Sequence, residues 1–256
     1  MSGEDWFSNN TGKGLSKLYK NSFVESFVDA DEYYAALRKE VEATKKDDLI
    51  CWIGFDVTGN APMPIDPNNE PAKSKPPRLR KSSDKEWFDL LKSASDDRNV
   101  MVTVLLNCHP SPKPHDKYKG ANFNLVQQLN TLKNCTAIND FRFLWLNGTH
   151  HQKLILIFNA QKGLIAFCGT CDVADNRITN KWAEVQCKIT GDCAVELYNV
   201  FSNRWNEHIK AQSPGGMLPL NIQFLSLSIP AKKSGNFLVQ AATTYGNPNR
   251  DTPFLL

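Results

Sequence analysis

Short apolar runs alternate with amphipathic segments along most of the chain. The first clear pattern starts at Asp31, which we expect to cap a helix, because Tyr33, Leu37 and Val41 recur at a spacing of four residues. The apolar run LICWIGF at 49–55 then predicts a buried strand. A helix followed at once by a buried strand is typical of layered α/β domains.

The same alternation is repeated further along the chain. Helices are predicted after residues 83–84 and over 121–132, and buried strands at 100–106 and 141–146. Between the strand at 49–55 and the helix after 83–84, six prolines predict a long loop over 57–82. We therefore expect an α/β fold with a central mixed β-sheet flanked by α-helices.

The segment that begins at His151 has a different pattern. Two apolar runs, KLILIF and GLIAFC, flank the stretch NAQK and predict a β-hairpin. A strand over 183–189 and a long amphipathic helix that opens at Asp192 are expected next. Residues 211–235 are rich in Pro, Gly and Ser, and one more strand is predicted from about residue 237.

Composition narrows the class of protein. The chain has 256 residues, of which 41% are hydrophobic, and a formal net charge of +3, which suits an anionic substrate without requiring nucleic acid. Seven irregularly spaced cysteines do not suggest a disulfide framework, and the N-terminus has no apolar leader. No apolar run is long enough to span a membrane. A cytoplasmic, reducing setting is the prediction.

Candidate chemistry is concentrated at His151 and Lys153. The two residues are two positions apart at the start of a predicted strand, so their side chains point to the same face. The imidazole can attack phosphorus or protonate a leaving oxygen, and the ammonium can balance charge on the non-bridging oxygens of a phosphodiester. Asp172 follows the second strand of the predicted hairpin, so we expect it to lie beside His151 and Lys153.

Two other His-x-Lys triplets, at 115–117 and 208–210, are interpreted as solvated surface. The first lies in a Pro-rich loop with no apolar strand after it, and the second lies at the end of a predicted helix. His150 and His151 are adjacent in sequence, and the hairpin could bring Cys168 and Cys171 near them. Such a set of ligands admits a four-coordinate zinc site. An alternating strand, however, places these two thiols on opposite faces, so neither a metal nor a cofactor is expected.

Several other residues received simpler interpretations. Trp145, Trp182 and Trp205 are predicted to be core aromatics. Glu184 is predicted to be an exposed strand position, with a place in the lining of the cleft as the alternative.

A wider pattern surrounds the His-x-Lys triplet. An apolar strand and a hairpin return lead to Gly169-Thr170-Cys171-Asp172, His150 precedes the triplet, and Trp182-Ala-Glu-Val is followed by a helix that ends in Arg-Trp. Over residues 23–245 this resembles the phospholipase D superfamily signature. Residues 1–22 are polar and rich in Gly and Asn, which predicts a flexible N-terminal arm. The resemblance implies a phospholipase D-like domain with one motif at 23–235 and the start of a second half at 236–256.

The resemblance also implies a mechanism and site roles. One histidine forms a phosphohistidine, a second histidine from another copy of the motif protonates the leaving alcohol, and no metal is needed. His151 takes the nucleophile or acid role and Lys153 binds phosphate, while the site is lined by Asp172, Gly169, Thr170 and His150. Phe158 stands where the family has the Asp of its motif.

Three functions follow from the resemblance. The favoured one is a hydrolase of phosphodiesters, with phospholipid as the preferred substrate. The second is a homodimeric nuclease in which each copy supplies one His151. The third is an inactive phosphate- or lipid-binding module that lacks the second motif. The second histidine would come from another copy of the chain or from a second half that this sequence does not contain.

Overall fold

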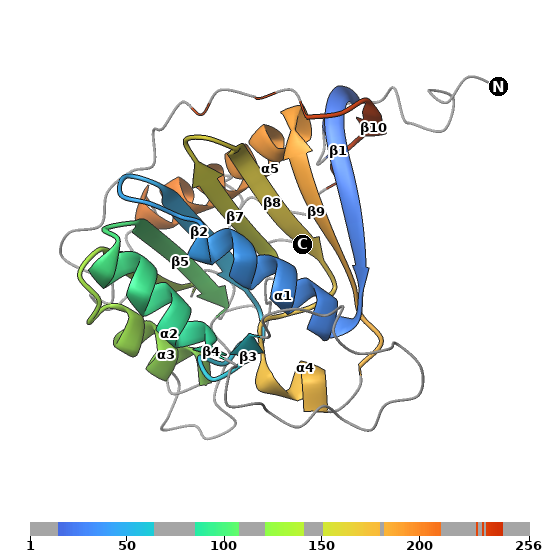
Figure 1. The fold of residues 1–256 in the computed structure, drawn as a ribbon. Coiled ribbons are helices and arrows are strands. Elements are labelled where there is room, and N and C mark those ends of the chain that lie inside the picture. Colours follow the sequence, from blue (N-terminus) through green and yellow to red (C-terminus); the bar gives the residue numbers. More distant parts are fainter. Residues whose placement is uncertain are drawn as a thin grey trace, which may run out of the picture.

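A computed structural model describes residues 15–63, 85–107, 121–140, 151–179, 182–210, 229, 232 and 234–242. Its centre is an eight-stranded sheet in the order β10-β1-β9-β8-β7-β2-β5-β6 (Figure 1). The strands are β1 Tyr19–Val28, β2 Leu49–Gly54, β5 Met101–Asn107, β6 Cys135–Asp140, β7 Leu154–Asn159, β8 Gly163–Gly169, β9 Val185–Gly191 and β10 Phe237–Val239.

The sheet is mixed. β2, β5 and β6 run parallel to one another, whereas the neighbours from β2 through β7, β8, β9 and β1 to β10 pair antiparallel. The helices are α1 Asp29–Glu42, α2 Trp87–Lys92, α3 Ala121–Leu129, α4 Asp175–Thr179 and α5 Asp192–Lys210, with a π-helical turn at Ser93–Asp97 and a two-stranded ribbon of β3 Pro62–Met63 and β4 Lys85–Glu86. The predicted α/β fold with a mixed sheet flanked by helices is confirmed.

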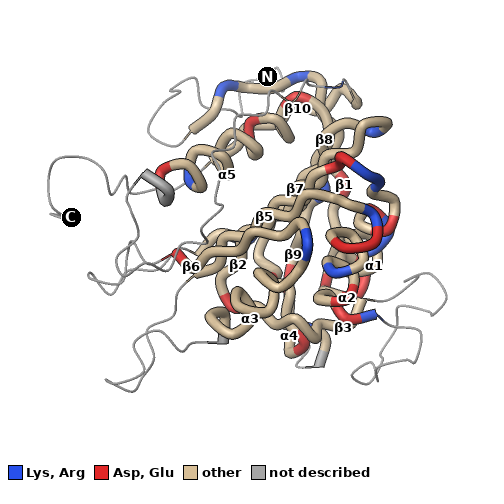
Figure 2. The backbone as a smooth tube through the Cα atoms, turned by 90° about the vertical axis from the view of Figure 1, so that its left-hand side faces the viewer, with Lys and Arg blue, Asp and Glu red and all other residues tan. Residues whose placement is uncertain are grey.

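Both faces of the sheet are covered at its centre, which explains why β2 and β7 are apolar almost without interruption. In β2, Ile50 and Trp52 belong to the core shared with α1, α2 and α3, whereas Leu49, Cys51 and Ile53 belong to the core shared with α5. Figure 2 shows the result, with α5 on one face of the sheet and α1 to α4 on the other. Successive residues of a strand point to opposite faces, so continuous apolar runs are required here.

The predicted hairpin is confirmed as β7 and β8, which pair from Leu154 with Cys168 to Asn159 with Gly163. The predicted long helix at Asp192 is confirmed as α5. The last strand, β10, pairs with β1 at the edge of the same sheet. That 236–256 begins a second half stays a prediction.

Two predicted boundaries were wrong, and one strand was missed. α1 starts at Asp29 behind the N-cap Val28, with no side-chain cap, so Asp31 lies inside the first turn. β1 starts at Tyr19, because its pairing with β9 and β10 extends into the predicted arm at 1–22. β6 at 135–140 was not predicted; the strand expected at 141–146 lies outside the described residues.

A charged contact joins α1 to the sheet. The buried Glu40 carboxylate lies 2.6 Å from Lys162 Nζ and 2.9 Å from Lys188 Nζ. Burial favours the neutral acid, but the two ammonium groups outweigh it and hold the pKa of Glu40 below its usual value.

Among the helices that the structure describes, none is both long enough and apolar enough to cross a membrane.

Candidate active site

The candidate site lies where the chain leaves β2 and β8 and enters β7. These three strands are neighbours, because β7 pairs with β2 on one side and with β8 on the other. Phe55 and Asp56 follow β2, His151 and Lys153 precede β7, and Asp172 follows β8. The segments are far apart in sequence and meet at one end of the sheet.

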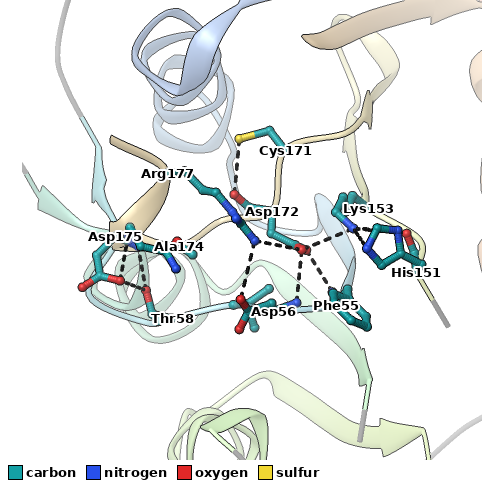
Figure 3. Close-up of polar contacts among 12 residues, drawn as sticks. Phe55, Asp56, Thr58, His151, Lys153, Cys171, Asp172, Ala174, Asp175 and Arg177 are labelled. Atoms are coloured by element: carbon teal, nitrogen blue, oxygen red, sulfur yellow. Dashed lines mark hydrogen bonds and ion pairs between the residues drawn. The ribbon is translucent and has the colours of Figure 1, made fainter. Parts of the chain in front are cut away.

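The Asp172 carboxylate is the centre of the site (Figure 3). The side chain is 1% exposed, its Oδ1 accepts the Phe55 N–H at 2.9 Å, and its Oδ2 accepts the Asp56 N–H at 3.1 Å. Lys153 Nζ lies 3.3 Å from Oδ2. Asp172 therefore lies beside Lys153 as predicted, with both carboxylate oxygens engaged.

His151 lies on the solvent side of Lys153. Its ring is exposed, and Lys153 Nζ is 3.4 Å from Nδ1 and 3.2 Å from Nε2. The Phe55 ring packs edge-on against the imidazole at 4.3 Å between centroids, and Lys153 Nζ lies 5.0 Å from the centroid of the same phenyl ring. An accessible imidazole is thus placed against a buried ammonium, and the expected shared face of the two side chains is confirmed.

Arg177 is a site residue that the sequence reasoning missed. It is buried on the short helix α4, with Nη2 at 3.8 Å from Asp172 Oδ2 and 3.5 Å from Asp56 Oδ2 (Figure 3). Its guanidinium carbon lies 4.3 Å from the centre of the Trp182 ring, and its Nε lies 3.9 Å from Glu184 Oε1. Arg177 links Asp172 to the residues that precede β9.

Two interpretations of this neighbourhood were wrong. Glu184 is buried, because its carboxylate lies beside the Arg177 guanidinium. Trp182 is 50% exposed, because one face of the indole covers Arg177 instead of entering the core. Trp205 is in the core as predicted, and Trp145 lies outside the described residues.

The described charged side chains at the site do not carry a net positive charge. Two cations, Lys153 and Arg177, face three carboxylates, those of Asp56, Asp172 and Glu184. The Asp56 carboxylate is 46% exposed, whereas those of Asp172 and Glu184 are buried. The site therefore offers one accessible acid at its edge and holds its cations close to counterions.

Gly169 and Thr170 connect β8 to β9. Thr170 N–H donates to the Val185 carbonyl at 2.9 Å, and the Thr170 hydroxyl accepts the Val185 N–H at 3.0 Å. A Cβ on Gly169 would overlap the same carbonyl oxygen. This geometry gives both residues a part in joining the strands; their predicted role in binding substrate stays a prediction.

Cys168 and Cys171 lie on opposite faces of the sheet. Cys168 packs with the α5 core, and the buried Cys171 belongs to the α1 core. Among the described residues, no three His, Cys, Asp or Glu side chains are grouped so that they could hold a metal ion.

The acidic position of the family motif lies at the far end of β7. Phe158 is five residues beyond Lys153, which corresponds to about 16 Å along an extended strand. Asn159 beside it donates to Asp48 Oδ2 at 3.2 Å and accepts the N–H groups of Gln161 and Lys162, so it holds the hairpin turn. A side chain at this end of β7 is too far from His151 to touch the same phosphate.

Three other histidines that the sequence singled out cannot be placed. His150 and His115 lie outside the described residues, and the side chain of His208 is not described.

Comparisons with known proteins found likenesses only among solved structures. The chain is similar to Nuc from Salmonella typhimurium, a phospholipase D family member, at 13% identity and a TM-score of 0.44, covering 72% of this chain and 95% of that one. It is similar to NucT from Helicobacter pylori at 13% identity and a TM-score of 0.47, covering 71% and 94%. Yeast tyrosyl-DNA phosphodiesterase gives 11% identity and a TM-score of 0.33, with 66% of this chain and 32% of that chain covered.

No family model matches the sequence, and no curated protein matches it. The solved structures named above share 11% to 13% of their residues with this chain. What those proteins bind or cleave is a property of each of them.

Proposed function

We propose that this chain is a phosphodiesterase in which His151 is the nucleophile or general acid and Lys153 binds the phosphate. The observation that carries the proposal is the placement of an exposed imidazole within 3.4 Å of a buried ammonium, on one face of a strand end. Phosphoryl transfer needs a nucleophile with open access to phosphorus and a fixed cation near the non-bridging oxygens.

In the proposed reaction, a nitrogen of His151 attacks phosphorus, an N–P bond forms, and the bond from phosphorus to the leaving oxygen breaks. A second histidine donates a proton to that oxygen. Water then attacks phosphorus, a new P–O bond forms, and the N–P bond to His151 breaks. The second histidine takes a proton from the water, so both histidines return to their starting states. Lys153, held by Asp172, offsets the charge on the phosphate oxygens throughout.

The proposed reaction needs a source for its second histidine. Within the described region, His151 is the only histidine whose side chain is defined. We propose that the complete site needs another copy of the motif, from a second chain or from a second half. In the homodimer version, two His151 side chains meet across a two-fold axis.

Phospholipid remains the favoured substrate, with nucleic acid as the alternative. The accessible Asp56 carboxylate at the edge supports this choice, because it repels a polyanion more strongly than a substrate with a single phosphodiester. Hydrolysis of vesicle phospholipid and of single-stranded DNA, measured side by side, separates the two substrates.

A second candidate function is a phosphate-binding module without catalysis. The observation in its favour is that Phe158 stands at the acidic position of the family motif, at the end of β7 away from His151. Such a module would bind vanadate or inorganic phosphate without forming a phosphohistidine.

The deciding experiment uses His151→Ala with bis(p-nitrophenyl) phosphate as the substrate. We expect the variant to lose hydrolysis and to trap no phosphohistidine in an acid-free quench followed by mass spectrometry. His115→Ala and His208→Ala are the matched controls and should keep the wild-type rate.

Two results would count against catalysis by this site. Unchanged turnover in His151→Ala would place the activity elsewhere. Vanadate binding by a wild-type protein that cleaves neither substrate would favour the binding module. Sedimentation of a strictly monomeric active protein would exclude the homodimer version.

A further inference from the structure

A buried charged contact lies behind the candidate site, on the opposite face of the sheet. Arg204 of α5 is 3% exposed, and its Nε and Nη2 lie 3.3 and 3.2 Å from Asp140 Oδ2. The Asp140 side chain, at the end of β6, is fully buried. The third contact of this guanidinium is with Gln152, whose Oε1 accepts from Nη1 at 2.6 Å.

Gln152 is the residue between His151 and Lys153. Because side chains alternate along extended chain, Gln152 points toward α5 while its two neighbours point toward the candidate site. A hydrogen bond from a charged donor to Gln152 therefore fixes the peptide that carries both site residues, from the face opposite to the chemistry.

The ion pair also fixes Arg204 itself. A buried arginine held at two nitrogens by one carboxylate has little freedom to follow a moving partner, so the position of Gln152 is set by β6 and α5 together. Buried ion pairs are weak contributors to stability when compared with apolar packing, but they restrict geometry when each charge has its partner.

We infer that Arg204 is a positioning residue for His151 and Lys153, acting through Gln152 and held in place by Asp140. The inference rests on the proposed function for its catalytic consequence, whereas its structural consequence can be measured without any activity. His151 depends on it more than Lys153 does, because Lys153 is also held by Asp172.

The test compares Gln152→Met, Gln152→Glu and Arg204→Met with the wild type by hydrogen–deuterium exchange of the peptide over residues 151–155. Gln152→Met removes the acceptor at similar length, and Gln152→Glu keeps an oxygen that can accept from Arg204. Loss of one charge-assisted hydrogen bond should speed exchange over this peptide about tenfold in Gln152→Met and Arg204→Met. Gln152→Glu should keep the wild-type protection.

Arg38→Met is the matched control for the loss of a buried arginine. Arg38 is also buried, donates to the Met63 carbonyl at 2.7 Å and contacts Glu42 at 3.1 Å, away from the candidate site. This variant should lower global stability in urea without selective loosening of 151–155.

Turnover gives the second measurement. In a protein that hydrolyses bis(p-nitrophenyl) phosphate, Gln152→Met should lower kcat about tenfold and change KM far less, because a misplaced nucleophile affects the transition state more than substrate binding. Gln152→Glu should keep the wild-type kcat, because it keeps an oxygen that can accept from Arg204.

The exchange experiment also separates the two proposals. Faster exchange in Gln152→Met in a protein without turnover would support the positioning contact and count against hydrolysis by this chain alone. Unchanged exchange and unchanged kcat in Gln152→Met would overturn the inference. So would Gln152→Glu behaving like Gln152→Met, or Arg38→Met loosening the same peptide equally.

Discussion

Replacing Asp172 by alanine removes the carboxylate on which the candidate site is built. The N–H groups of Phe55 and Asp56 lose a charged acceptor, and hydrogen bonds to charged groups contribute about 1.5–3 kcal/mol each. Lys153, 6% exposed, loses its counterion, and breaking a buried pair costs about 3–5 kcal/mol. One carboxylate makes all these contacts, so the costs overlap, and we expect Asp172→Ala to lower the free energy of unfolding by about 3–5 kcal/mol.

Urea unfolding followed by circular dichroism measures this change. Asp56→Ala is the matched control, because its carboxylate is 46% exposed and lies 3.5 Å from Arg177, so its loss should cost under about 1 kcal/mol. The double variant of Asp172→Ala with Lys153→Met should be more stable than the sum of the single losses predicts, by about 1–2 kcal/mol, since the methionine leaves no buried charge unpaired at position 153.

Either of two results would refute this reasoning. A loss under about 1 kcal/mol in Asp172→Ala would mean that the carboxylate is not desolvated as its burial implies. Additive losses in the double variant, within about 0.5 kcal/mol, would mean that Lys153 and Asp172 do not interact.

Other contacts give further predictions. Lysines hold the pKa of Glu40 below its usual value despite its burial, so its contribution to stability is complete above its unfolded pKa of about 4.3 and is lost as the pH falls through the lower folded value. The stability difference between wild type and Glu40→Gln should therefore shrink in acid, and a constant difference in urea unfolding would contradict this. Burial raises the pKa of Cys171 to about 12, so iodoacetamide should label it more slowly than the half-buried Cys187 in the native protein; mass spectrometry showing the reverse order would contradict the burial. Gly169→Ala should destabilise by about 1–3 kcal/mol, since its Cβ would overlap the Val185 carbonyl oxygen, and an unchanged urea midpoint would show that the strands can move apart.

Local patterns in the sequence were sufficient for most of the sheet. The buried strands at 49–54 and 101–107 and the hairpin after Lys153 were predictable, because unbroken apolar runs and turn residues are local properties. β6 escaped prediction because CTAIND has few strong strand formers, and its pairing with β5 decides its conformation.

A signal for part of the missed site was present in the sequence. Asp56 comes two residues after a buried strand, and ligand-binding groups in α/β sheets gather beyond the carboxyl ends of parallel strands. Arg204 belongs to the Arg-Trp pair that the resemblance includes, but nothing in the local pattern marks it as a partner of Gln152, and no comparable signal marks Arg177.

What the sequence determined by itself is the pairing of His151 with Lys153 on one face, because alternation along an extended chain depends only on covalent geometry. The tertiary structure decided which charges are buried and with which partners. Glu184 was expected to be exposed and is buried beside Arg177, while Trp182 was expected in the core and is half-exposed over the same guanidinium. A charge can be buried only where an opposite charge or a hydrogen-bond partner meets it, and that partner comes from another part of the chain, so the folded arrangement and not the local pattern decides the outcome.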